Sequence, residues 1–242
     1  MKIPGTAIEK TSLRELHGRQ KLRYIWDYYK LPIVIALIFL YIIGYNIYRQ
    51  ATYKETVLSA AFVNVSASDE LASRLTDDFL TDTGLSDGKH RFYRYENLYL
   101  TDNTDSENHQ YVYASRMKIL GAIDSESMDL VFMDKEAFDA FSQNWYLCDI
   151  EALLLEQEPD LYEALFDSIQ TNTYILEDNA DEVLLDPSVE YQAETAEYPM
   201  GIALTDCPII QAAGFSDTIY LGIIANSPHK ETAVSYLKYL YH

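Results

Sequence analysis

Hydrophobic residues form one long continuous run near the N-terminus of this chain, and only short runs or periodic stripes after it. Between Lys30 and Arg49 lie 18 residues without a charge, LPIVIALIFLYIIGYNIY. As a helix that rises about 1.5 Å per residue, this run spans about 27 Å, close to the roughly 30 Å hydrocarbon core of a bilayer. The pattern therefore predicts a transmembrane helix over 31–49, in contact with the lipid bilayer.

Aromatic residues flank the apolar run on both sides, where rings with one polar tip favour the headgroup zones. They are Tyr24, Trp26, Tyr28 and Tyr29 before the run, and Tyr41, Tyr45, Tyr48 and Tyr53 at its far end. A buried core helix would not be apolar on all faces over this length. A cleavable signal peptide needs a small-residue site after the run, which NIYRQATY does not offer, and a lipoprotein signal needs a Cys there. We therefore expect an uncleaved anchor.

The next segment predicts a strand followed by a helix. VLSAAFVNV (57–65) is a continuous apolar run rich in Val and Ala, as in a strand buried on both faces. Ser66, with Asp69 three residues on, gives a capping-box start for a helix, and Gly84 stands where a C-terminal cap belongs. The expected buried stripe of this helix is Leu71, Leu75 and Phe79.

The remaining patterns alternate between strands and helices. Strands are expected at 91–100, 128–134, 173–177, 182–186, 201–206 and 218–227. Helices are expected at 135–144, at 161–170, around Tyr113, Met117 and Leu120, and after a cap at Ser227, where Pro228 takes the first position and Ala233, Leu237 and Leu240 are buried. The predicted fold class is α/β: one transmembrane helix plus an open, mostly parallel sheet with helices on both faces.

Charge divides the chain into two parts. Residues 1–30 hold seven basic and three acidic residues, a net charge of +4, whereas residues 50–242 hold ten basic and 35 acidic residues, a net charge of −25. Because basic flanks stay in the cytoplasm, we expect 1–30 to be cytoplasmic, 50–56 to be a linker, and 57–242 to be an extracytoplasmic domain of a cell-membrane protein. An acidic field repels nucleic acid, and it either attracts basic partners or serves solubility alone.

Three segments carry a resemblance to a known family. They are DDFLTDTG (77–84), which ends a helix; MKILGAIDSESMDLVFMDKEAFDAFSQNWYLCDIEALL (117–154), a helix, strand, helix and return; and IYLGIIANSPHKETAVSYLKYL (219–240), a strand, Asn-Ser turn and C-terminal helix. In order and spacing they resemble the extracellular solute-binding proteins of ABC importers, of the type 2 periplasmic-binding-protein-like kind. The resemblance covers roughly half of the outer domain and implies a lobe that binds a ligand without catalysis.

The chain departs from that family in one respect. The matched segments all belong to the first of two lobes, and only 46 residues lie between Leu154 and Gly201. An independent lobe needs on the order of 100 residues. We therefore expect a single lobe, in which the strands at 57–65 and 129–133 are adjacent and parallel, and a second lobe that is missing or vestigial.

Three polar residues stand where such sheets bind ligands. Open α/β sheets hold ligands at the carboxyl ends of their strands, near a switch in strand order. Asn64 and Ser66 follow the first strand and Asp134 follows the third, so all three are candidate ligand-binding residues. Turn chemistry and helix capping are the alternative explanation of these three residues.

No motif of a hydrolase, a zinc protease or a phosphate-binding loop is present in the sequence. His90, His109 and His229 fall in loops or at helix starts, with no nucleophile suggested beside them. We therefore expect no catalytic residue, no metal site and no cofactor.

Two further groups have alternative explanations. Asp102, Asp105 and Glu107 share a polar loop that offers oxygen ligands for Ca²⁺, but not at the spacing of an EF-hand, so a solvated loop is preferred. The row Tyr93, Tyr95 and Tyr99 lies on one face of the second strand, where rings either stack on sugars or pack under a helix.

Cys148 and Cys207 are the only cysteines, so one intramolecular disulfide is available. The extracytoplasmic compartment permits it, and the resemblance implies that both segments lie near the crossover between lobes. Two separate buried thiols are the favoured alternative, because free Cys is among the most buried residue types.

The sequence therefore predicts a membrane-anchored, extracytoplasmic binding domain without catalytic activity. Its partner is a small-molecule ligand or a membrane protein. The main alternative is a protein-interaction subunit of a membrane complex that has lost ligand binding. A cell-surface enzyme is disfavoured because no nucleophile, base or metal cluster is evident.

Overall fold

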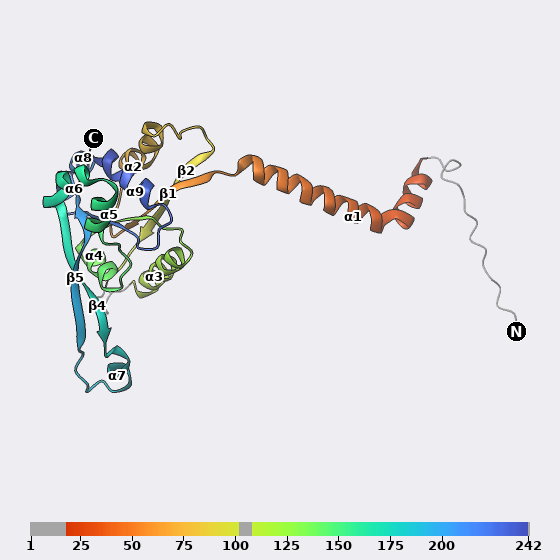
Figure 1. The fold of residues 1–242 in the computed structure, drawn as a ribbon. Helices are drawn as coiled ribbons and strands as arrows, with labels where there is room; N and C mark the ends of the chain where they lie inside the picture. Colours follow the sequence, from red (N-terminus) through yellow and green to blue (C-terminus); the bar gives the residue numbers. More distant parts are fainter. Residues whose placement is uncertain (1–17, 102–107, 242) are drawn as a thin grey trace. The chain divides into compact units, whose positions relative to one another are not determined.

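The structure is a computed structural model that describes residues 18–101 and 108–241. It divides into two compact units, Met1–Tyr53 and Lys54–His242. The first unit contributes a single long helix and the second contributes a layered α/β domain (Figure 1).

The first unit is the helix α1, Arg19–Thr52, which is 34 residues long. Its segment Lys30–Thr52 is long and apolar enough to cross a membrane, and its apolar side chains are exposed. The predicted helix is thus present, and it continues beyond Arg49 as far as Thr52. Exposed apolar residues over this length are compatible with a membrane anchor.

The second unit is built on one six-stranded sheet. Its strands are β1 (Glu55–Val63), β2 (His90–Leu98), β3 (Leu130–Met133), β4 (Ile169–Asp178), β5 (Ala193–Ala203) and β6 (Tyr220–Ile223). Their order across the sheet is β2-β1-β3-β6-β5-β4, so the sheet is open, with β2 and β4 at its edges.

Eight helices accompany the sheet in the described part of this unit. They are α2 (Asp69–Asp82), α3 (His109–Asp124), α4 (Lys135–Gln143), α5 (Ile150–Gln157), α6 (Pro159–Leu165), α7 (Ala180–Leu185), α8 (Pro208–Ala213) and α9 (Lys230–Leu240). Short 3₁₀ turns, η1 (Phe166–Ser168) and η2 (Leu204–Asp206), follow α6 and β5.

Only half of the sheet is parallel. β1 lies between β2 and β3 and is parallel to both, which confirms the predicted pairing of the first and third strands. The pairings of β3 with β6, β6 with β5 and β5 with β4 are antiparallel, so the expectation of a mostly parallel sheet is wrong. β4 and β5 are consecutive strands that form a hairpin, and β6 is antiparallel to both of its neighbours.

Both faces of the sheet are buried, and alternate residues of each central strand point to opposite faces. In β1, Leu58, Ala60 and Phe62 belong to a cluster that includes residues of α2, α5, α6, α8 and α9. Ala61 and Val63 belong to a second cluster that includes residues of α3 and α4. The prediction that helices cover both faces is therefore confirmed.

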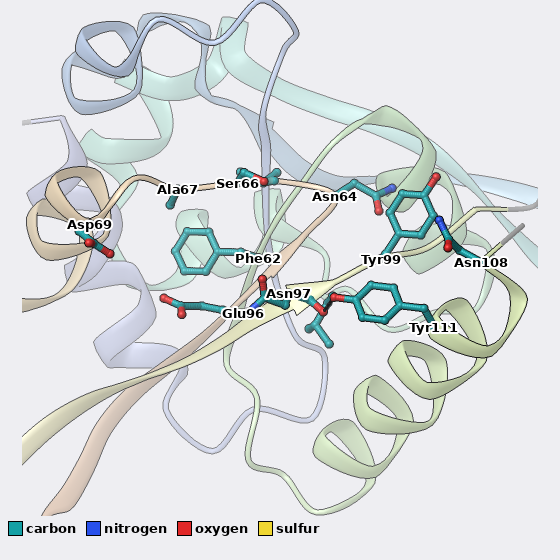
Figure 2. Close-up of a pocket in the computed structure, with 12 residues that line it drawn as sticks. Phe62, Asn64, Ser66, Ala67, Asp69, Glu96, Asn97, Tyr99, Asn108 and Tyr111 are labelled. Carbon is teal, nitrogen blue, oxygen red and sulfur yellow. Dashed lines mark hydrogen bonds between the residues drawn. The ribbon is translucent and has the colours of Figure 1, made fainter. Parts of the chain in front are cut away.

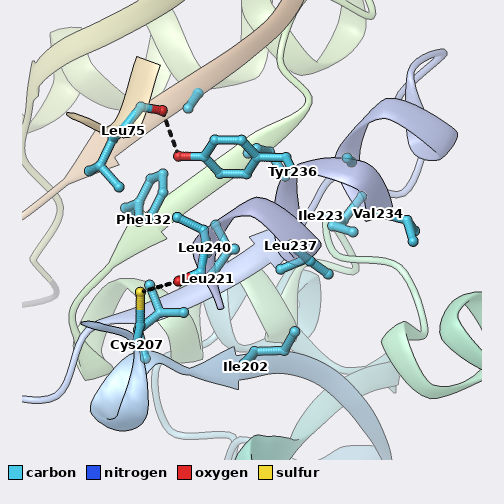
Figure 3. Packing of buried hydrophobic residues seen from close by; sticks show 14 of the residues in the cluster. Leu75, Phe132, Ile202, Cys207, Leu221, Ile223, Val234, Tyr236, Leu237 and Leu240 are labelled. Atoms are coloured by element: carbon cyan, nitrogen blue, oxygen red, sulfur yellow. Dashed lines mark hydrogen bonds between the residues drawn. The ribbon is translucent and has the colours of Figure 1, made fainter. Parts of the chain in front are cut away.

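The first of these clusters, which contains Leu58, Ala60 and Phe62, also contains a buried tyrosine that makes a hydrogen bond (Figure 3). Tyr236 of α9 is fully buried, and its hydroxyl donates to the carbonyl oxygen of Leu75 in α2 at 2.8 Å. The buried stripe Ala233, Leu237 and Leu240 on α9 is as predicted. The hydrogen bond matters because a phenol buried without a partner would be costly.

Helix ends explain two differences from the predicted boundaries. α2 is capped by Ser68, whose hydroxyl accepts from the backbone N–H of Leu71 at 3.2 Å, and not by Ser66. α9 begins at Lys230, and Ser227 instead donates its hydroxyl to Asp129. Ser68 is a second serine ahead of α2 that can act as its cap, whereas His229, the residue before α9, makes no side-chain cap.

Three helices end in the same hydrogen-bonded motif with a left-handed residue. Gly84 fills this position after α2, as predicted, with φ of 72°. Glu126 after α3 and Trp145 after α4 have φ of 52° and 56°, although a side chain in this conformation costs roughly 1–2 kcal/mol. Residues held in this way are often found at functional sites.

One predicted strand is a helix in the structure. EVLLD (182–186) was expected to be a strand, but α7 covers most of it, because a short apolar run does not distinguish the two structures. The helix predicted around Tyr113, Met117 and Leu120 is present as α3. Tyr113 and Met117 are exposed, and the buried face of α3 is formed by Val112, Ser115, Ile119, Ala122 and Ile123.

The hairpin β4–β5 extends beyond the rest of the sheet and carries α7 at its tip (Figure 1). Only Ile202 and Ala203 of β5 pair with β6, so residues 171–199 form a two-stranded ribbon with a helical tip. We call residues 171–199 the hairpin arm. The middle segment of the chain thus forms this arm together with α5 and α6, and not a second lobe.

The two cysteines are not bridged. Cys207 is buried, and its Sγ lies 3.4 Å from the carbonyl oxygen of Leu240 (Figure 3). Cys148 is half-buried against the same cluster. The favoured expectation of two separate thiols is confirmed.

Candidate functional site

The candidate site is a pocket of about 500 Å³ at the carboxyl ends of β1 and β2 (Figure 2). Residues that follow β1 line one part of it, and the end of β2 with the start of α3 lines another. This is the edge of the sheet at which open α/β folds bind ligands. Its polar lining residues are Asn64, Ser66, Asp69, Glu96, Asn97, Tyr99, Asn108 and Tyr111.

Two asparagines shape the walls of this pocket. Asn64 follows β1 with φ of 59°, and Asn97 lies near the end of β2 with φ of 58°. Asparagine enters the left-handed region more readily than most residues with a side chain. Each asparagine therefore turns the chain at a strand end without a glycine.

The side chain of Asn64 ties three segments together. Its Oδ1 accepts from the backbone N–H of Leu100 at 2.9 Å, and its Nδ2 donates to the carbonyl oxygen of Leu100 at 2.7 Å. Nδ2 also lies 3.1 Å from Oδ1 of Asp134. The amide thus prolongs the pairing of β1 with the chain that leaves β2, and it joins both to the end of β3.

The structure therefore brings two of the three predicted residues, Asn64 and Asp134, together at the β1/β3 switch in strand order. Asp134 also caps α4, because its Oδ1 accepts from the backbone N–H of Ala137 at 2.8 Å. Asn64 and Ser66 line the pocket, whereas Asp134 is not a lining residue and contacts Asn64. Ligand binding by these residues remains a prediction.

Acidic and phenolic groups dominate the remaining lining. Asp69 and Glu96 lie at one side of the pocket, and Tyr99, Asn108 and Tyr111 lie at the other (Figure 2). These groups suit ligands that carry hydroxyl or ammonium groups, because carboxylates and amide oxygens accept hydrogen bonds from both. No lysine, arginine or histidine is among the lining residues of the described chain.

Sequence reasoning identifies Tyr99 as a ring that could stack on sugars, but it does not identify Asp69, Glu96 or Tyr111 as site residues. It places Asp69 in a helix cap, and Glu96 with Asn97 inside a strand. A signal was present in the sequence: Glu96 and Asn97 stand at the end of the second predicted strand, where the rule applied to Asn64 holds equally. Applying it to every parallel strand would have found them.

A second polar cluster lies where the start of β3 meets the middle of β1. Asp129 is 1% exposed, and its Oδ2 accepts from the backbone N–H of Ser59 at 2.7 Å and from the Ser59 hydroxyl at 2.8 Å. Its Oδ1 accepts from the Ser227 hydroxyl at 2.7 Å and lies 3.0 Å from Nδ1 of His229. Sequence reasoning does not identify this cluster, because Asp129 and His229 are 100 residues apart.

A carboxylate that holds an imidazole also occurs in hydrolase triads. Here no hydroxyl or thiol of the described residues is hydrogen-bonded to the other ring nitrogen of His229. Every bond of Asp129 instead joins the start of β3 to β1 or to the loop before α9. Its role in this arrangement is to link three segments.

The other sequence candidates are separated. The rings of Tyr93 and Tyr95 lie side by side on β2, with centroids 4.8 Å apart, whereas Tyr99 lies beyond β2 and lines the pocket in Figure 2. The three tyrosines therefore do not form one row. The acidic loop with Asp102, Asp105 and Glu107 lies outside the described residues. Elsewhere in 18–101 and 108–241, no three His, Cys, Asp or Glu residues gather as metal ligands.

Comparison with known proteins gave no match. No protein-family model, curated protein or solved structure is similar to this chain.

Proposed function

We propose that this protein is a membrane-anchored, extracytoplasmic binding domain, similar to one lobe of a solute-binding protein. It acts without catalysis and takes a small polar solute into the pocket of Figure 2. In this proposal α1 is a signal anchor in the cell membrane, with the N-terminus in the cytoplasm and the α/β domain outside.

The observation that carries the proposal is the composition of the pocket. Two carboxylates, from Asp69 and Glu96, face a cavity that also contains amide and phenol groups. The carboxylate of Glu96 is paired with Arg94 at 3.0 Å, which holds it in place and partly neutralises it. Converging polar groups at the ends of parallel strands are typical of ligand sites in α/β folds.

The chemistry of the lining favours two ligand classes over a third. The carboxylates can accept hydrogen bonds from neutral solutes rich in hydroxyl groups and from cationic amines. The phenol rings can pack against the apolar surface of either kind of ligand. Anions meet carboxylates, within a domain whose net charge is strongly negative. Because one lobe supplies all the contacts, the ligand keeps one side in solvent and binding is weaker than in a two-lobed cleft.

Ligand-induced stabilisation of the full-length protein in detergent tests this proposal. Spermidine represents the amines, maltose the hydroxyl-rich solutes and citrate the anions. A ligand at 100 times its dissociation constant stabilises the folded state by about 2.7 kcal/mol, which is readily seen as a higher melting temperature. We expect spermidine or maltose to produce this shift and citrate not to do so.

Two variants show whether the shift arises in the pocket. Glu96→Gln removes a lining carboxylate and should weaken the response to spermidine. Glu194→Gln makes the same change on an exposed part of β5 and should leave it unchanged. A response that is equal in the two variants contradicts the assignment of the pocket.

A further inference from the structure

The hairpin arm exposes apolar side chains at its tip. Leu184 and Leu185 of α7 are 81% and 86% exposed, and Leu176 of β4 and Tyr191, which precedes β5, are 46% and 50% exposed. Two adjacent leucines with this exposure at the end of a projecting hairpin are unfavourable in water. Their placement is explained if another surface covers them.

The base of the arm is fixed to the body of the domain. Asn172 donates to Oδ1 of Asp139 at 2.8 Å and to the hydroxyl of Ser142 at 3.0 Å. The left-handed Trp145 lies against Tyr174 and Tyr198, with ring centroids 4.2 and 6.5 Å apart. An isolated two-stranded hairpin is marginally stable, so these contacts hold the arm in an extended form.

All charged residues of the hairpin arm are acidic. Its residues 171–199 contain eight acidic residues and no basic residue. The surrounding sequence shares this bias, because residues 136–229 contain neither lysine nor arginine. Acidic groups therefore surround the exposed leucines on α7, where Asp181 and Glu182 precede them and Asp186 follows.

We propose that the hairpin arm is a docking element for another protein, whose surface combines an apolar groove with lysine and arginine residues. Leu184 and Leu185 enter the groove, and the flanking acids pair with the basic rim. Charge argues against two other occupants. A second copy brings the same acidic arm, and a bilayer with anionic headgroups repels it. This inference goes beyond solute binding and does not depend on the pocket.

Site-specific photo-cross-linking in native membranes tests the proposal on the full-length protein. Leu184 is replaced by p-benzoylphenylalanine in one variant, and the exposed Tyr113 of α3 is replaced in a control variant. We expect an adduct with a different protein at position 184 and none at position 113. The cross-linked peptide of that protein, identified by mass spectrometry, should carry an excess of lysine and arginine.

A charge-neutralising variant tests whether the acidic residues around the leucines pair with basic residues of the partner. Asp181→Asn, Glu182→Gln and Asp186→Asn together should lower the adduct yield at position 184 about fivefold or more, as should 0.5 M salt. The matched control, Glu156→Gln, Asp160→Asn and Glu163→Gln, removes three exposed acids from α5 and α6 and should not change the yield.

Four outcomes overturn the proposal. They are the absence of any adduct at position 184, an adduct of twice the mass of this chain, an adduct with lipid, and an adduct whose yield does not respond to the neutralised acids. Because pocket variants such as Glu96→Gln leave the arm intact, failure of solute binding and failure of docking are distinguished.

Discussion

The side chain of Asn64 joins the end of β1 to two other segments of the chain. Its Nδ2 donates to the carbonyl oxygen of Leu100 and faces Asp134. Asn64→Asp removes these donors and places a second carboxylate near Asp134. We expect the free energy of unfolding at pH 7 to fall by about 2–3 kcal/mol, as measured by urea denaturation of the full-length protein in detergent.

Asn97→Asp is the matched control for this change. Asn97 has almost the same left-handed backbone, but none of the described residues is hydrogen-bonded to its side chain. Asn97→Asp should change the free energy of unfolding by no more than about 0.5 kcal/mol. Equal losses in the two variants would show that the backbone conformation, and not the side-chain clamp, determines the cost.

The left-handed residue after α3 offers a test of stored backbone strain. Glu126 occupies the position that Gly84 fills after α2. Glu126→Gly should stabilise the protein by about 1 kcal/mol, because glycine adopts this conformation without steric cost. Gly84→Ala should destabilise it by a similar amount, and thermal unfolding measures both. A destabilising Glu126→Gly would show that the Glu126 side chain makes a favourable contact.

At the scale of elements, strand packing depends on close approach at Gly222 of β6. A Cβ there would lie 2.7 Å from Cδ2 of Leu147 and 2.9 Å from Cε of Met133. Both side chains are fully buried, so making space for a Cβ would require neighbouring residues to shift as well. Gly222→Ala should therefore cost about 1–3 kcal/mol of unfolding free energy.

Gly121 in α3 provides the contrast to Gly222. A Cβ at Gly121 meets nothing within 4 Å, and alanine is the better helix former by up to about 1 kcal/mol. Gly121→Ala should thus stabilise the protein in the same denaturation experiment. A neutral Gly222→Ala would show that the second cluster adjusts more readily than its burial indicates.

Elements with a strong period were predicted from the sequence, whereas strand direction was not. The apolar run of β1 and the stripe of α2 follow directly from local sequence. The antiparallel half of the sheet depends on which strands become neighbours, and the pattern of one strand carries no information about its partner. For the same reason Asn64 could be found from its place after a strand, but the pairing of Asp129 with His229 could not.

The whole molecule is expected to lose stability in alkaline solution. Burial raises the pKa of Cys148 to about 12, and burial also raises the pKa of Cys207, Tyr236 and Tyr241. An unfolded thiol ionises near pH 8.5 and an unfolded phenol near pH 10. The folded state therefore binds more protons than the unfolded state above pH 8.5, and stability falls as the pH rises toward 12.

Unfolding free energies measured between pH 7 and pH 11 examine this expectation. Stability should be constant below about pH 8 and should then decrease steadily. Cys148→Ser removes one ionising group and should make the decrease less steep. A pH-independent stability would contradict the raised pKa values.

The proposed topology is also a property of the whole chain. Protease added to intact cells or protoplasts should digest residues beyond about Tyr53 and spare the N-terminal segment, because the net charge of +4 over residues 1–30 is expected to retain that end in the cytoplasm. Permeabilised cells are the control, in which the N-terminal segment is digested too. Protection of the C-terminal domain in intact cells would reverse the orientation.

The position of β6 has a consequence for biogenesis. β6 lies between β3 and β5, and it is therefore the strand that joins the parallel half of the sheet to the hairpin half. It is also the last strand to be synthesised, at residues Tyr220–Ile223 of 242. While the chain emerges from the ribosome, the two half-sheets exist without their common neighbour, and their inner edges stay open. The two halves of the sheet can therefore join only after β6 has been synthesised.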